Sequence, residues 1–216
     1  MNMSPIRSID PSGLPLCRAY VAVLFGPILV QLSPVGGAAD PRSEPMLWAL
    51  GILADGLPDY LGAWQLSGPK GPRWGAIVDD LKTRGVERIR FVIGPDPVDI
   101  KAALLAQYGD GNRKPDCTVL PSSGPTVESA FVEGLLPGHR PYIDRAREVA
   151  IPLGRRLGRA VARHGGFVDP ASAAALLYQS AERYIRANWP EPPEPRPSFA
   201  SSLPALAVQP GLVAAG

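Results

Sequence analysis

One carboxylate in this chain stands where a strand end could hold a metal ion. Asp96 follows the apolar run Phe91-Val92-Ile93 and the pair Gly94-Pro95, so it would lie just beyond a buried strand. Divalent cations such as Mg²⁺ prefer oxygen ligands, and Asp96 could supply one. Asp96 also precedes Pro97, however, and Asp followed by Pro is typical of the start of a helix. We expect the helix-capping role, with Asp96 as a weak candidate for catalysis.

A second group of residues could bind phosphate. Seven Arg but only two acidic residues lie between positions 140 and 164. Arg155, Arg159 and Arg163 are spaced by four residues, which places them on one face of a helix, and Arg156 lies beside them. Such a stripe could contact DNA phosphates without reading the bases. The alternative is an ordinary solvated face opposite an apolar stripe.

The remaining reactive residues are too isolated to form a recognisable centre. The two His and two Cys show no metal-binding spacing, so we expect no metal site. A lone Cys on a strand, such as Cys117, is typical of a small buried side chain. The adjacent carboxylates of Asp79 and Asp80 fall in the middle of a predicted helix, where we expect them to be solvated. The net charge of +2 does not by itself indicate a nucleic-acid partner.

The elements that would position these residues follow an α/β order. Apolar, β-rich runs and helical periodicity alternate along the chain, and Gly or Pro separates most of them. Five strands are predicted: one at 20–32, made of the runs 20–25 and 28–32, and four more at 46–53, 57–65, 88–93 and 117–120. Helices are predicted at 72–84, 96–107, 126–136, 141–164 and 169–188. Gly26-Pro27 should break the first apolar run, Asp55-Gly56 should form a hairpin turn, and Pro152 should kink or split its helix.

This order predicts a ribonuclease-H-like fold, in which a mixed five-stranded sheet is flanked by helices. Tight connections indicate an antiparallel trio of strands, and the strand–helix–strand units that follow add parallel strands through right-handed crossovers. We expect four regions: a loose lead-in at 1–15, the core at 16–138, a helical extension with a basic face at 139–188 and a disordered tail at 189–216. The tail contains seven Pro, which cannot join regular hydrogen-bond ladders.

Several motifs resemble those of mutator-type insertion-sequence transposases. The most specific is Leu81-Lys82-Thr83-Arg84-Gly85-Val86, which follows a helix containing Trp74. Tyr60-Leu61-Gly62-Ala63-Trp64 is similar to the end of a strand in that family, and Ala49-Leu50-Gly51-Ile52 with Asp55-Gly56 is similar to its hairpin. The likeness covers residues 20–120 well and 140–188 loosely. It implies the same ribonuclease-H-like fold.

The resemblance also implies a metal-dependent reaction on DNA, but the residues for it are missing. In the family, three acidic residues hold two divalent ions, Mg or Mn. These two ions act on the phosphodiester. The position expected for the first acid holds Pro27, and no Asp or Glu occurs from position 11 to 39. The second position holds Pro95, and the third acid has no counterpart. The family's Cys-x-x-His is incomplete too, because Leu120 stands where His would follow Cys117.

We therefore expect a degenerate, truncated relative of the family, related to DNA transposition and recombination but without intact catalytic residues or a bound metal cofactor. One alternative is a repurposed DNA-binding or protein-binding module on the same fold. Another is an unrelated small α/β protein, with secretion as one option. The expected partners are DNA, through the basic helix, and a second copy or a relative of the same family. The longest apolar run, at 19–32, is shorter than the roughly 20 residues of a spanning helix, so we expect no membrane and a cytoplasmic location.

Overall fold

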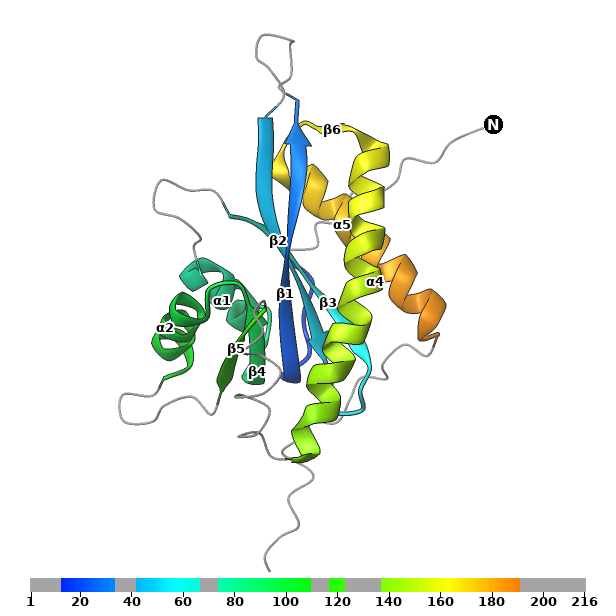
Figure 1. The fold of residues 1–216 in the computed structure, drawn as a ribbon. Coiled ribbons are helices and arrows are strands. Elements are labelled where there is room, and N and C mark those ends of the chain that lie inside the picture. The colour runs from blue at the N-terminus through cyan, green and yellow to red at the C-terminus, as the bar shows by residue number, and fades with distance from the viewer. Residues whose placement is uncertain (1–12, 34–41, 67–73, 110–116, 123–136, 191–216) are drawn as a thin grey trace, which may run out of the picture.

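A computed structural model describes residues 13–33, 42–66, 74–109, 117–122 and 137–190 (Figure 1), and all structural statements concern these residues. The helix predicted at 126–136 lies outside them. So do residues 1–12 of the predicted lead-in and residues 191–216 of the predicted tail.

The described residues form a mixed sheet in the strand order β3-β2-β1-β4-β5. Strand β1 pairs antiparallel with β2, and β2 pairs antiparallel with β3, which confirms the predicted trio. Strand β4 then adds in parallel to β1, and β5 in parallel to β4. The strands are β1 (Ala19–Leu32), β2 (Arg42–Ile52), β3 (Pro58–Gln65), β4 (Arg88–Gly94) and β5 (Thr118–Pro121). The α/β class and the ribonuclease-H-like strand order are therefore confirmed.

Two features of β1 differ from the prediction. The strand is not broken at Gly26-Pro27 but runs through them, pairing Pro27 with Leu47 of β2. On the other side of β1, pairing with β4 stops at Leu24, so Pro27 lies on a stretch with only one neighbouring strand. Proline has no N–H to donate. It is tolerated at this position because the side of β1 that faces no neighbouring strand needs no hydrogen-bond donor. Beyond this stretch β1 pairs with a sixth, unpredicted strand, β6 (Gly166–Phe167).

Helices cover both faces of the sheet (Figure 1). One layer contains α1 (Trp74–Thr83) and α2 (Pro97–Tyr108), and the other contains α4 (Arg140–His164), which follows the 3₁₀ turn η2 (Pro137–His139), and α5 (Pro170–Asn188). Each layer buries its own apolar cluster against the sheet, so the sheet has a core on both sides. No helix in the described part of the chain has both the length and the apolar character that a membrane crossing requires.

Most of the predicted element boundaries are confirmed. Gly56 has a φ of 80° in the turn between β2 and β3, and Gly85 has a φ of 106° after α1, as glycines at such positions allow. Asp169 accepts a hydrogen bond from the Ser172 N–H at 2.7 Å and caps α5 in a capping box. Hydrogen bonds from Ser172 lower the pKa of Asp169. Of the two outcomes predicted at Pro152, a kink or a split, the split is wrong: α4 continues through it, because apolar residues on both sides pack against the sheet.

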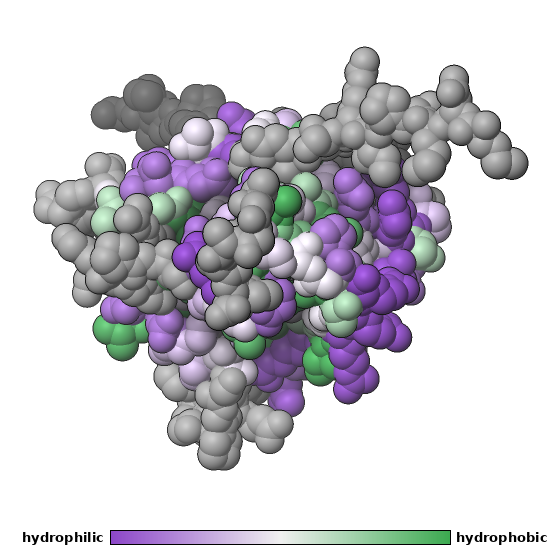
Figure 2. Space-filling model, turned by 90° about the horizontal axis from the view of Figure 1, so that it is seen from above, coloured by the Kyte–Doolittle hydropathy of each residue, from purple (hydrophilic) through white to green (hydrophobic). Residues whose placement is uncertain are grey.

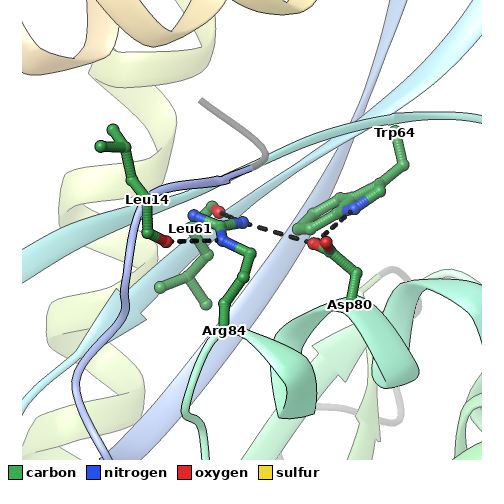
Figure 3. A network of polar contacts seen from close by, with 5 residues as sticks. All are labelled: Leu14, Leu61, Trp64, Asp80 and Arg84. Atoms are coloured by element: carbon green, nitrogen blue, oxygen red, sulfur yellow. Dashed lines mark hydrogen bonds and ion pairs between the residues drawn. The ribbon is translucent and has the colours of Figure 1, made fainter. Parts of the chain in front are cut away.

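A buried arginine fastens α1 to the sheet (Figure 3). The Arg84 side chain is only 6% exposed and follows the last turn of α1. Its Nε donates to the Leu14 carbonyl at 2.8 Å, and its Nη1 donates to the Leu61 carbonyl of β3 at 2.6 Å. Nη1 also lies 3.3 Å from Oδ2 of Asp80, one turn earlier in α1. The guanidinium therefore joins α1, β3 and the segment before β1.

The same contacts explain two of the sequence motifs. Trp64 donates from Nε1 to Oδ2 of Asp80 at 3.1 Å, so β3 and α1 share one carboxylate. Asp80 was predicted to be solvated, but the side chains of Trp64 and Arg84 both contact its carboxylate. Gly62, with a φ of 147°, leaves room for the side chains of Arg84 and Trp64, since a Cβ there would lie 3.3 and 3.2 Å from them.

We expect Arg84→Met to destabilise the protein by about 2–4 kcal/mol. The substitution keeps much of the side-chain volume but leaves the buried Leu61 carbonyl and the part-buried Leu14 carbonyl without a donor and Asp80 without its cation. Urea unfolding of the purified protein would measure the change. The matched control is Arg88→Met, at an exposed position of β4, which should change stability by less than about 0.5 kcal/mol. Equal losses in the two variants would contradict the role of the buried network.

Candidate functional site

The structure places the two positions expected to hold catalytic acids near each other. Strands β1 and β4 are parallel neighbours, and Leu24 is the partner of Ile93. Pro27 lies three residues beyond Leu24, and Pro95 two residues beyond Ile93, so both lie past the end of the β1–β4 pairing. Both prolines are exposed. The geometry is that of a shared strand-end site, but neither side chain can bind a metal ion.

Asp96 lies at this edge but does not act as predicted. It occupies the N-cap position of α2, and its carbonyl accepts from the Ile100 N–H at 3.0 Å. Its side chain, however, makes no capping hydrogen bond, because the backbone (φ −121°, ψ 75°) departs from the extended conformation usual at an N-cap. No cluster of three or more His, Cys, Asp or Glu suited to a metal ion occurs among the described residues.

An indole fills the space between β1 and the helix that covers it. Trp48 of β2 is the strand partner of Gly26 and is 4% exposed. A Cβ built on Gly26 would overlap the Trp48 ring, and one built on Gly154 of α4 would lie 3.2 Å from its Cζ2 atom. Trp48 thus packs against the backbone at Gly26 and the backbone at Gly154. Both can approach the indole closely because glycine has no side chain. A carboxylate side chain at position 26 would have no room beside this indole.

The helix α4 offers no acid to this region either. Its buried side chains are all apolar. Its two acids, Asp144 and Glu148, are more than half exposed and lie 3.6 and 3.4 Å from Arg140 and Arg145. These are surface pairs within one helix, which contribute little to stability. The two acids of α4 therefore lie away from the buried face of the helix.

The incomplete Cys-x-x-His motif lies on β5 and just before it. Cys117 is half-buried and packs at the edge of the α1–α2 core, rather than being fully buried as predicted. Leu120, at the position of the missing His, is 2% exposed and belongs to the core on the opposite face of the sheet.

The predicted basic face is present on α4. Arg155, Arg159 and Arg163 are exposed, and Arg156 is half-buried beside them. No ion pair to an acid is present at any of these four within the described residues, unlike at Arg140 and Arg145. Figure 2 looks down on the end of the molecule where α4 finishes, and strongly hydrophilic side chains gather on the side where α4 and α5 lie.

The stripe extends onto α5, which the sequence analysis missed. A hollow of about 240 Å³ lies between the two helices. Its lining residues are Arg156, Ala160, Arg163, His164, Leu176, Gln179, Ser180 and Arg183. The sequence did contain a signal for these residues of α5. Counted from Tyr178, Gln179, Ser180 and Arg183 stand one, two and five positions further along the chain, a spacing that places all three on one side of a helix. That spacing points to α4 only once the packing of the two helices is known.

We expect Gly26→Ala to cost about 1–3 kcal/mol in urea unfolding, because the added methyl overlaps the Trp48 ring. In a Trp48→Leu background the smaller side chain leaves space, so the same change should cost clearly less. Gly75→Ala is the control, since nothing lies within 4 Å of a Cβ at that exposed helical position, and it should be neutral or slightly stabilising. An equal cost of Gly26→Ala in both backgrounds would show that the indole does not occupy this space.

Comparison with known proteins connects this geometry to a family. No curated protein matches the chain. Residues 14–114, which run from the segment before β1 past α2, match the model of the family described as "Transposase, Mutator family". The matched range includes Arg84, Gly62 and Trp64 as well as the strand ends that carry Pro27 and Pro95. Residues 14–114 of this chain are therefore similar to the mutator family of transposases.

Proposed function

We propose that this protein is a catalytically inactive relative of the mutator transposases that binds DNA without cutting it. The observation that carries the first half is the composition of the strand ends. Pro27 and Pro95 stand where the family resemblance places carboxylates, and Trp48 fills the space beside Gly26.

Without these carboxylates, the protein lacks the ligands for the metal ions that DNA cleavage requires. Two-metal catalysis needs acidic oxygens that hold both ions and balance their charge while they clamp the attacking and leaving oxygens. Asp96 alone offers one carboxylate at this edge. A single aspartate supplies too few ligands and too little negative charge to hold a pair of divalent ions.

The second half rests on the exposed arginines of α4. Arg155, Arg159 and Arg163 lie on one face and are not neutralised by acids of the described chain. Their planar guanidinium groups suit phosphate oxygens. Contacts of this kind give affinity that depends on salt and little on sequence, because they neutralise the backbone rather than read base edges. DNA binding of this kind needs no metal ion.

Purified protein with Mg²⁺ or Mn²⁺ should not nick supercoiled plasmid DNA above the level of a buffer control. The reason is the missing ligand set, so Asp96→Ala should behave like the unchanged protein. The assay measures conversion to the open-circular form on a gel. Metal-dependent nicking that disappears in Asp96→Ala would overturn the proposed inactivity.

The Arg155/Arg159/Arg163→Ala variant should bind a DNA duplex more weakly and with a smaller salt dependence. Each lost phosphate contact lowers the slope of log affinity against log salt by about 0.9, so the slope should fall by about 2–3. Fluorescence anisotropy at several salt concentrations measures both quantities.

The charge-matched control for this experiment is Arg18/Arg88/Lys101→Ala. These residues are exposed, but they lie away from α4, before β1, at the start of β4 and on α2. The control variant should keep nearly the original affinity and slope. Equal weakening in both variants would indicate a general charge effect, and no binding at low salt would remove the DNA-binding proposal.

A further inference from the structure

We propose that the hollow between α4 and α5 is a binding site for one phosphate group, which shares Arg163 with the exposed stripe but does not include Arg155 or Arg159. Its cations come from two helices: Arg156 and Arg163 from α4, and Arg183 from α5. The site goes beyond the proposed DNA binding, because it does not require that the stripe contact DNA.

The lining combines several positive groups with neutral donors and no acid. Three guanidinium groups and the His164 imidazole surround the space, together with the Gln179 amide. None of the three arginines forms an ion pair with an acid of the described chain. Their mutual repulsion is unfavourable, and an anion between them would relieve it.

One donor in this site is left without an acceptor. The Nε of Arg156 is buried and has no hydrogen-bond partner among the described residues. A buried charged donor that makes no hydrogen bond is costly, and an anion in the hollow that Arg156 lines would offset part of this cost. The exposed arginines of the stripe have no such requirement, since water can solvate them.

The size of the hollow favours a small ligand. Its volume of about 240 Å³ is below the roughly 300–1,000 Å³ of pockets for drug-sized molecules. The His164 ring, which also lines the hollow, stacks on Phe167 with 4.2 Å between centroids and an angle of 4°. Several arginine forks converging on a small space match a phosphate, whose oxygens accept from more than one fork at a time.

Calorimetric titration of the full chain with inorganic phosphate, at constant ionic strength in chloride, tests the site. We expect saturable binding that Arg183→Gln weakens by about tenfold or more, because it removes one charged donor. Arg186→Gln is the matched control, on the same helix but outside the hollow, and should bind like the unchanged protein. Arg163→Gln is a second loss variant in case Arg183→Gln does not fold.

Absence of phosphate binding, or equal binding by Arg183→Gln, Arg163→Gln and the unchanged protein, would overturn the proposal. Duplexes with a 5′-phosphate or a 5′-hydroxyl distinguish two sources of the group. Tighter binding of the 5′-phosphate form, lost in Arg183→Gln, would assign the site to a DNA end, and equal binding of both forms would assign it to free phosphate. An Arg155/Arg159→Ala variant that loses duplex affinity but keeps phosphate binding separates this site from the stripe.

Discussion

A buried guanidinium determines how the layer of α1 and α2 is attached to the sheet. Arginine cannot lose its charge in a folded protein, and burying a charge is costly unless hydrogen bonds replace its water. Arg84 meets this condition only when the end of α1, the Leu61 carbonyl of β3 and the Leu14 carbonyl are all in place. One residue therefore couples three segments that are far apart in the sequence. The layer beside the strand ends of β1 and β4 depends on that coupling.

The elements that could be predicted from the sequence carry their own local signals. The Asp55-Gly56 turn and the start of the last helix at Asp169 depend on residues within a few positions of each other, and both are confirmed. Pro27 misled the prediction because its cost depends on whether the strand side beside it is occupied, which is a property of the whole sheet. Strand β6 was missed for a related reason: two residues form a strand only because β1 extends far enough to pair with them.

The same division between local and non-local information applies to the candidate site. The basic face of α4 follows from a spacing of four residues, so periodicity alone predicts it. Arg183 reaches the hollow only through the packing of α5 against α4, which no local pattern encodes. Asp80 shows the same limit in the other layer, because its partner Trp64 lies on a different element. The positions expected to hold acids follow from the family resemblance, and the sequence itself shows that Pro27 and Pro95 stand there.

The packing around Trp48 also holds the helix that presents the arginines. Carboxylates gathered for metal binding repel one another when no ion is present, whereas a buried aromatic ring contributes apolar burial. Trp48 provides this between β1 and α4, and the close approach of Gly154 to its ring sets how near α4 lies to the sheet. The arginines of the stripe begin at the next residue of the helix. A chain without catalytic acids could therefore keep α4 in position. The arginines of the stripe need only this positioned helix to present a surface for phosphate.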